Sequence, residues 1–178
     1  MEDFAQLGGR NRETKYRASM EQVAGLLDAY CTFPTVEKVK LLRLALFSFL
    51  VGNEDMHLKN FSVIRNGDVV ALSPAYDLLN TTIVFARPEE ELALPLNGKK
   101  HNLTRKDFLE YFARERLGLT DRVVDKILSG FIQARPRWEE LIGMSFLSET
   151  MQKKYLQVLD TRFARIFGIR CHGIRCQA

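Results

Sequence analysis

The sequence predicts a mainly α-helical domain that carries one β-hairpin. Apolar residues recur at helical spacing over several stretches of the 178-residue chain, and one region places two short β-rich runs close together. These runs flank Asn66-Gly67-Asp68, which is a strong turn signal for a hairpin. No internal repeat or linker interrupts the pattern, so the length favours a single domain with a sizeable core.

The first fifty residues predict helices that lead into a loop. Residues 1–17 are polar and are expected to form a short helix and then a loop, whereas Met20–Tyr30 carries an apolar helical stripe. Thr35 is the predicted N-cap of a strongly apolar helix over Val39–Val51, which we expect to be central. Gly52 is suited to end that helix in a left-handed conformation.

The hairpin is predicted to follow a loop over Asn53–Asn60. Phe61–Ile64 is the expected first strand and Val69–Leu72 the return strand. Pro74 closes the second strand, because the residue before a proline favours an extended backbone. A hairpin brings its two open ends together, so residues just before the first strand and just after the second should lie close in space.

The rest of the chain is predicted to be helical after an irregular stretch. Leu78–Phe85 fits either a strand or a buried loop, and Leu92–Leu96 fits an extended segment before an Asn97-Gly98 turn. Helices are then expected over Asp107–Arg116 with Thr104 as N-cap and Asp107 as the capping-box acid, from Thr120 to an end at Pro136, over Trp138–Ile142, and over Ser148–Phe167.

Composition excludes several classes of protein. The hydrophobic content of 46% is ordinary for a globular protein, and no apolar run of about 18 residues predicts a transmembrane helix. The acidic, polar N-terminus is unlike a secretory signal, so we expect a cytoplasmic protein. A net charge of +4 permits an anionic partner, but without a long basic run we assign the excess cations to solvated faces.

Cysteine usage predicts neither disulfides nor a metal centre. Cys31, Cys171 and Cys176 are odd in number and widely spaced, which argues against a disulfide framework. His172 lies between the last two, but a zinc site would need further ligands. We therefore interpret residues 171–178 as a flexible tail that follows one domain over residues 1–170.

A cluster of polar residues marks the candidate site. Asp55, His57, Lys59 and Asn60 place a carboxylate, an imidazole, an ammonium and a carboxamide within six residues, and Asp77 follows Asp55 by 22 positions. Asn60 precedes the first predicted strand and Asp77 follows the second, so the hairpin should bring them to one end. Neighbouring strands lie about 5 Å apart, and two such groups can share one cation.

Each of these residues also has an ordinary interpretation. A lone Asp or Asn caps helices and turns, a lone His is most often structural, and a lone Lys is usually a solvated charge. The joint pattern favours a function, because two convergent carboxylates repel each other unless a cation lies between them. A zinc hydrolase would need more His ligands, a serine hydrolase lacks its G-x-S-x-G elbow, and no glycine-rich phosphate loop is present.

Two motifs resemble one known family. G-N-x-D-x-H-x-K-N-F-S-V begins at Gly52, and L-x-P-A-Y-D-L-L-x-T begins at Leu72. Together they resemble the HipA-like serine/threonine kinases, the toxin kinases of bacterial toxin–antitoxin modules. The opening Glu2–Gly8, Lys15-Tyr16 and the segment Leu92–Lys99 resemble further family segments, so the likeness extends over residues 2–170.

The resemblance implies the C-terminal lobe of a protein-kinase-like fold and a role for each residue. Asp55 matches the catalytic Asp that orients or deprotonates the acceptor hydroxyl, and Asn60 and Asp77 match the Mg²⁺ ligands. His57 and Lys59, with Asn60, match loop residues that contact nucleotide phosphates and brace the site. The implied cofactors are ATP and Mg²⁺. The implied substrate is a protein Ser or Thr, on an aminoacyl-tRNA synthetase in well-studied members.

The resemblance also implies partners. The family's N-terminal lobe, with its loop over the phosphates and its ATP-binding lysine, has no counterpart in these residues, so we expect little kinase activity from this polypeptide alone. A helix-turn-helix antitoxin is the family's usual partner. Two other functions stay open: a non-catalytic nucleotide- or partner-binding regulatory module, and a basic nucleic-acid-binding domain, which steep salt dependence would reveal.

Overall fold

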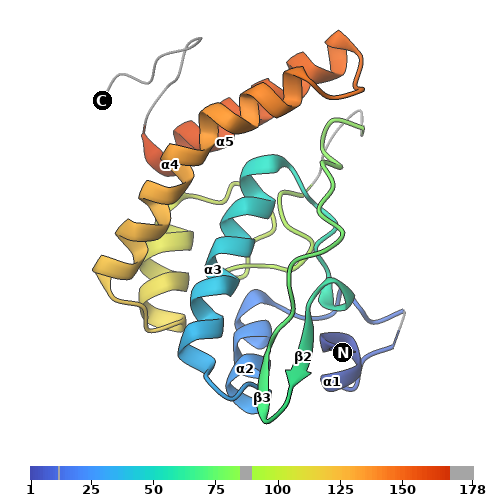
Figure 1. Cartoon of the computed structure of the whole chain (residues 1–178), viewed down its shortest axis with the longest axis vertical. Helices are drawn as coiled ribbons and strands as arrows, with labels where there is room; N and C mark the ends of the chain where they lie inside the picture. The colour runs from blue at the N-terminus through green and yellow to red at the C-terminus, as the bar shows by residue number, and fades with distance from the viewer. Residues whose placement is uncertain (12, 85–89, 169–178) are drawn as a thin grey trace.

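The computed structural model describes residues 1–11, 13–84 and 90–168, and it is mainly helical with one small antiparallel sheet. The predicted tail over residues 171–178 lies outside the described residues. The longer helices are α2 (Met20–Tyr30), α3 (Pro34–Val51), the π-helix η2 (Asp107–Arg116), α4 (Asp121–Gly143) and α5 (Glu149–Phe167). Figure 1 shows α3 at the centre, with the sheet on one side and the α4–α5 pair across its far end. No helix in the described ranges is long and apolar enough to cross a membrane.

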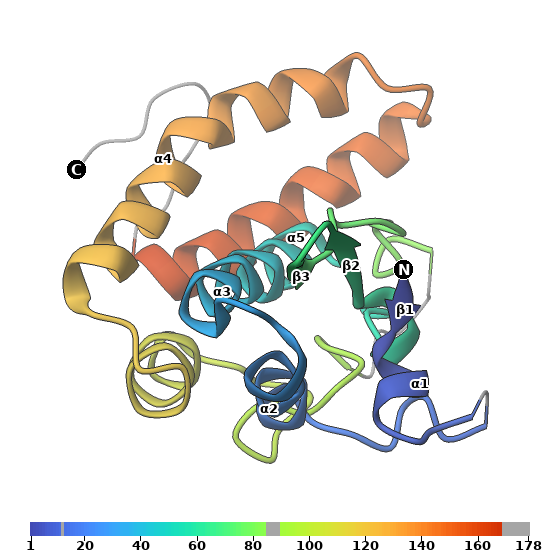
Figure 2. The same cartoon turned by 60° about the horizontal axis from the view of Figure 1, so that its bottom comes forward.

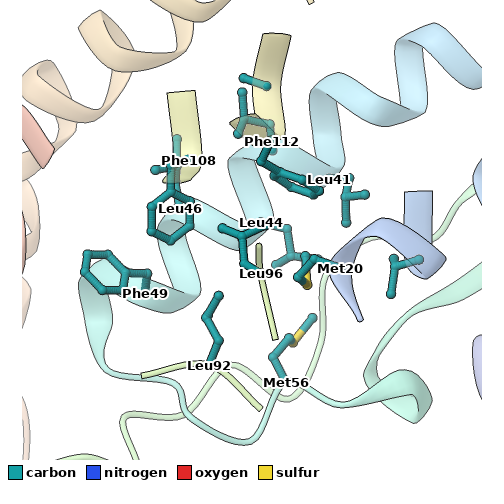
Figure 3. Close-up of a cluster of buried hydrophobic side chains, with 14 of the residues drawn as sticks. Met20, Leu41, Leu44, Leu46, Phe49, Met56, Leu92, Leu96, Phe108 and Phe112 are labelled. Carbon is teal, nitrogen blue, oxygen red and sulfur yellow. The ribbon is translucent and has the colours of Figure 1, made fainter. Parts of the chain in front are cut away.

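The core is built around α3. Leu41, Leu46 and Phe49 of this helix have no exposed surface, and Phe49 lies 5.0 Å from the Phe108 ring of η2, centroid to centroid. Figure 3 shows side chains from α2, α3 and η2 converging on this cluster. The helix α3 is apolar on most of its circumference. It therefore packs against other elements of the fold on several sides, because a helix with one polar face would lie on the surface.

The start of α3 differs from the prediction, whereas its end does not. The helix begins at Pro34 and its N-cap is Phe33, so Thr35 as N-cap is wrong. Pro34 takes the first helical turn, where its missing N–H costs nothing and its fixed φ is already helical. At the other end Gly52 adopts the predicted left-handed conformation, with φ of 79°.

The hairpin has the predicted position. β2 (Ser62–Asn66) pairs antiparallel with β3 (Val69–Leu72), and Asn66 opposes Val69 across the turn. A third strand, β1 (Glu2–Asp3), pairs with β2 on its other edge and precedes the short helix α1 (Phe4–Leu7). The sequence prediction included the helix but missed β1, because two residues carry no detectable periodicity.

The irregular stretch after the hairpin contains turns. Within Leu78–Val84 the described residues form no strand, and Val84 N donates to Thr81 O at 3.1 Å. Phe85 lies outside the description. Leu96 and Lys99 form the isolated bridge that closes the predicted Asn97-Gly98 turn.

The C-terminal half corrects one helix boundary. The Thr104 and Asp107 capping pair is present, with Thr104 N donating to Asp107 Oδ2 at 2.9 Å, but the helix that follows has π-type hydrogen bonding. Pro136 lies inside α4, so the predicted end there is wrong, and the segment Trp138–Ile142 continues the same helix. A proline removes one backbone hydrogen bond and bends a helix without necessarily ending it. Figure 2 shows that α4 is bent.

Candidate active site

The loop between α3 and β2 carries four of the five predicted site residues, and buried apolar residues anchor it to the core. It ends in the 3₁₀ turn η1 (Leu58–Asn60) directly before β2. Met56 and Leu58 are almost fully buried, and Figure 3 shows Met56 directed into the core cluster. These apolar anchors alternate with Asp55, His57 and Lys59, so packing of the loop onto the core fixes where the polar residues lie.

The hairpin brings Asn60 and Asp77 into direct contact. Asn60 Nδ2 donates to Asp77 Oδ2 at 2.9 Å and to the backbone oxygen of Asp55 at 3.0 Å. One side chain therefore links the loop before the first strand to the segment after the second. The proximity expected from an antiparallel hairpin is present, and Asn60 is buried at its centre.

Tyr76 holds the second segment against the first. Its hydroxyl donates to the Lys59 backbone oxygen at 2.7 Å and lies 2.5 Å from Ser62 Oγ. Ser73 N donates to Ser62 O at 2.8 Å, which extends the strand pairing beyond β3. These bonds bring the chain around to Asp77, whose backbone is left-handed with φ of 56°. Asp is one of the few non-glycine residues that tolerate this conformation.

Asn53 is a structural site residue that the sequence analysis did not single out. Its Oδ1 accepts from Asp55 N at 3.2 Å, and its Nδ2 donates to Asp77 O at 3.4 Å. The side chain is 1% exposed, so it bridges the backbones of both acidic residues from within the fold. Its place directly after the helix-ending glycine was the available signal.

Asp55 is held by a residue from the N-terminal segment. Tyr16 Oη donates to Asp55 Oδ1 at 2.6 Å. Burial and the bond to Asp55 raise the pKa of Tyr16 to about 12, so the phenol stays protonated and acts as a donor. The sequence analysis noted Lys15-Tyr16 as a family segment but did not predict this contact, because nothing local to Tyr16 indicates a partner 39 residues away.

His57 is buried next to Lys15. Lys15 Nζ lies 2.6 Å from His57 Nε2, and because an ammonium has no lone pair, the histidine nitrogen accepts. Nδ1 then carries the proton, and it has no hydrogen-bond partner in the described part of the chain. Burial lowers the pKa of His57, and the Lys15 charge lowers it further. The imidazole is therefore neutral at pH 7.

Lys59 lies apart from the other four side chains. It is exposed on η1, and within the described ranges its side chain makes no hydrogen bond or ion pair. Only its backbone oxygen takes part, by accepting from Tyr76. The structure thus joins Asp55, Asn60 and Asp77 in one bonded group, places His57 beside it, and leaves the Lys59 ammonium free for solvent.

The donor set fits magnesium better than a softer metal. Among the described residues, no group of three or more His, Cys, Asp or Glu side chains is arranged to hold a metal ion. Mg²⁺ commonly uses one or two protein oxygens and completes its shell with water and phosphate. The Asn60 amide points its nitrogen at Asp77 Oδ2, so its oxygen and Asp77 Oδ1 are the available ligands.

Comparison with known proteins decides the family. A family profile described as "HipA-like C-terminal domain" matches residues 1–138. This chain belongs to the HipA-like C-terminal domain family. The predicted resemblance is confirmed, and the match contains every candidate site residue.

Relatives of this HipA-like chain carry kinase names. "Putative kinase Y4dM" of Sinorhizobium fredii is 36% identical over 141 residues, which are 78% of this chain and 34% of the relative. A "Putative kinase" of Haemophilus influenzae is 26% identical over 163 residues, covering 82% of this chain and 46% of the relative. "Serine/threonine-protein kinase toxin HipA" of Shewanella oneidensis is 34% identical over 73 residues, or 41% of this chain and 17% of the relative.

A solved structure supports the fold. HipA of Shewanella oneidensis MR-1, in a complex with HipB and operator DNA, superposes with a TM-score of 0.67 at 23% identity. The match covers 94% of this chain and 41% of that one. This chain therefore spans less than half the length of each relative with which it is compared. The mainly helical fold and its likeness to the fold of HipA are confirmed.

Proposed function

We propose that this chain is the catalytic C-terminal lobe of a HipA-family serine/threonine kinase, supplying the magnesium ligands and the residue that orients the acceptor hydroxyl. One observation carries the proposal. The Asn60 amide contacts the Asp77 carboxylate at 2.9 Å and the Asp55 backbone at 3.0 Å, so a single side chain unites three residues that the family pattern assigns to phosphoryl transfer.

Asp55 is proposed to position the hydroxyl of a protein Ser or Thr. Tyr16 donates to its Oδ1, which leaves Oδ2 to accept a hydrogen bond from a substrate hydroxyl. Because the pKa of Tyr16 is about 12, the phenol donates its proton to the hydrogen bond without giving it up. Asp55 is thus held in one orientation while it aligns the nucleophile.

Asn60 Oδ1 and Asp77 are the proposed magnesium ligands. Mg²⁺, when bound there, would neutralise phosphate charge on ATP. The neutral, buried His57 ring would brace the site from within the fold. The exposed Lys59 side chain is free to approach a phosphate from solvent. Lys15 keeps the imidazole in its Nδ1-protonated tautomer by donating to Nε2.

Partners extend the proposal beyond the chain. The relatives are longer, so phosphate transfer is proposed to require a kinase N-terminal lobe that covers the ATP phosphates. The Shewanella HipA structure contains HipB and operator DNA. We extend that association to this chain as a proposed interaction with a HipB-like antitoxin, and the toxin role follows from it.

A reconstituted kinase tests the proposal. The chain would be joined to the N-terminal lobe of the Sinorhizobium relative and assayed for transfer of radiolabelled γ-phosphate to protein. We expect transfer by the fusion, a loss of at least about 10²-fold with Asp55→Asn, and little transfer by the 178-residue polypeptide alone. Equal transfer by the wild-type and Asp55→Asn fusions would refute the assigned role.

A regulatory binding module is the alternative. Mg-ATP binding by the fusion with no phosphate transfer, under conditions in which the intact relative is active, would support this function over catalysis.

A further inference from the structure

A second polar cluster, whose members are buried or half-buried, adjoins the candidate active site. It consists of Glu54, Thr81, Thr82 and Arg162. Glu54 precedes Asp55 in the chain, and the two threonines follow Asp77 by four and five positions. Arg162 comes from α5, 108 residues beyond Glu54. The cluster therefore joins both site segments to a distant helix.

Arg162 makes two directional contacts with the site loop and the helix before it. Its Nη2 donates to Glu54 Oε1 at 2.9 Å, and its Nη1 donates to the backbone oxygen of Phe49 at 2.8 Å. The side chains of Arg162 and Glu54 are 6% and 8% exposed. The guanidinium also stacks at 5.2 Å from the Phe49 ring centroid. The guanidinium is planar, and two hydrogen bonds and the aromatic ring fix its position, so it has little freedom to move.

The threonines complete the link to the Asp77 segment. Thr82 Oγ1 lies 2.5 Å from Glu54 Oε1, the same oxygen that Arg162 holds. Thr81 Oγ1 accepts from Glu54 N at 2.9 Å. The backbone N–H groups of Thr81 and Thr82 both donate to Gly52 O, at 2.9 and 3.1 Å. Glu54 is thus bonded on its backbone and its side chain to the segment that follows Asp77.

Gly52 permits this close approach. A Cβ built at this position would lie 2.8 Å from Thr82 Oγ1 and from Asn80 Oδ1. The Asp77 segment therefore packs against the bare backbone at the end of α3. The two site segments are held together at the hairpin side by Asn60 and at the opposite side by Glu54 and Arg162.

We propose that Arg162 is a positioning residue for the magnesium site. Through Glu54 and Thr82 it fixes the loop that carries Asp55 relative to the segment that carries Asp77, without touching metal or substrate. The inference rests on the proposed function, because the property that it sets is the fit of Asn60 and Asp77 to one cation. Its consequence is that α5 determines metal affinity from outside the site.

Mn²⁺ binding to the purified 178-residue chain tests the inference. Mn²⁺ substitutes for Mg²⁺ on oxygen ligands, and its paramagnetism broadens nearby amide NMR signals even when binding is weak. The variants are Arg162→Met, Thr82→Val, and the double variant Glu54→Met with Arg162→Met, which replaces the ion pair by apolar groups. Arg135→Met is the control, because it removes another buried arginine that bonds to Glu139 and Asp160. Thermal unfolding of each variant establishes the folded fraction at the temperature of the titration.

The expected result separates positioning from stability. Arg162→Met weakens Mn²⁺ binding by about 10-fold or more, as loss of a supporting contact does at metal sites, and Thr82→Val weakens it less. The double variant recovers thermal stability but not Mn²⁺ affinity. Arg135→Met leaves the affinity of the folded protein at the wild-type value.

Two other results have distinct meanings. Wild-type broadening that is centred on Asp77 and unchanged in Arg162→Met and in Thr82→Val would overturn the positioning role and leave the magnesium site standing. If broadening near Asp77 is equal in the wild-type and Asp77→Asn proteins, the magnesium site itself is contradicted, and the positioning role falls with it.

Discussion

Two buried arginines in this molecule, Arg135 and Arg162, each pair with a carboxylate and lie over an aromatic ring, but they connect different parts of the fold. Arg135 lies between α4 and α5, where it is 1% exposed, pairs with Glu139 and Asp160, and stacks 4.4 Å from the Phe163 ring centroid. Arg162 reaches from α5 to the loop beside Asp55. The first joins helix to helix. The second also bonds to the end of α3, but its ion pair joins a helix to irregular backbone, which has no regular hydrogen-bonding pattern of its own to keep it in place.

The two arginines also differ in how exposed their carboxylate partners are, and this difference determines how much stability is lost when each arginine is removed. Glu139 and Asp160 are 35% and 48% exposed, so water can solvate them if Arg135 is lost. Glu54 is 8% exposed and would keep an uncompensated charge within the fold. Removing one partner of a buried ion pair is strongly destabilising, and the Arg162–Glu54 pair lies beside the candidate active site.

Breaking each arginine pair should give unequal losses of stability. Arg162→Met is expected to lower the free energy of unfolding by about 3–5 kcal/mol, because Glu54 is left buried and unpaired. Arg135→Met should cost less, about 1–3 kcal/mol, mainly from lost packing and hydrogen bonds. Urea unfolding followed by circular dichroism measures both. Equal losses would show that partner exposure does not control the cost.

Two glycines that end helices allow the candidate site to be compared with the α4–α5 pair in the same way. Gly52 and Gly168 both end helices with positive φ, 79° and 73°. Counting the described residues alone, an added Cβ would have atoms within 4 Å at Gly52 but not at Gly168. Gly168→Ala should cost about 1 kcal/mol from backbone strain alone. Gly52→Ala should cost about 2–4 kcal/mol, because Asn80 and Thr82 must also move. Denaturant midpoints at constant slope would reveal the two values, and similar losses would contradict the close packing at Gly52.

The smallest expected effect is a pH dependence from His57. Burial and Lys15 lower the pKa of His57 in the folded chain below its ordinary value of 6.5. The unfolded chain therefore binds more protons below pH 6.5, and the contribution of the neutral imidazole to stability, present above that pH, is lost as pH falls through the folded pKa. The unfolding temperature should fall more steeply from pH 7 to pH 5 in wild type than in His57→Gln. Parallel curves would argue against a buried neutral histidine.

The sequence was informative where contacts are local and less so where they are long. Asn60 and Asp77 lie 17 residues apart but only one hairpin apart, so strand periodicity and a turn signal were enough to predict that they meet. Tyr16 reaches Asp55 across 39 residues, and Arg162 reaches Glu54 across 108. No periodicity encodes such distances, so these contacts became visible only in the folded chain.

The end of α4 was predicted wrongly for a related reason, because it too depends on contacts between distant parts of the chain. Pro136 is a sound local stop signal, yet α4 continues through it, because residues on both sides are held by tertiary packing. Phe131 before the proline is buried in the core, and the Trp138 ring after it lies 5.4 Å from the Phe47 ring of α3, centroid to centroid. Packing that spans a proline can maintain a bent helix at the expense of one hydrogen bond.

The pair Asn60–Asp77 as a magnesium site is the central claim, and Mg²⁺ titration of the ¹⁵N-labelled chain tests it most directly. The Asn60 side-chain amide donates to Asp77 Oδ2, so its NMR signals report on the proposed ligands themselves. The account predicts saturable shifts of these signals and of the Asp77 backbone amide, and their loss in Asp77→Asn. Unchanged Asn60 side-chain signals at saturating Mg²⁺, in a chain shown to be folded, would contradict it.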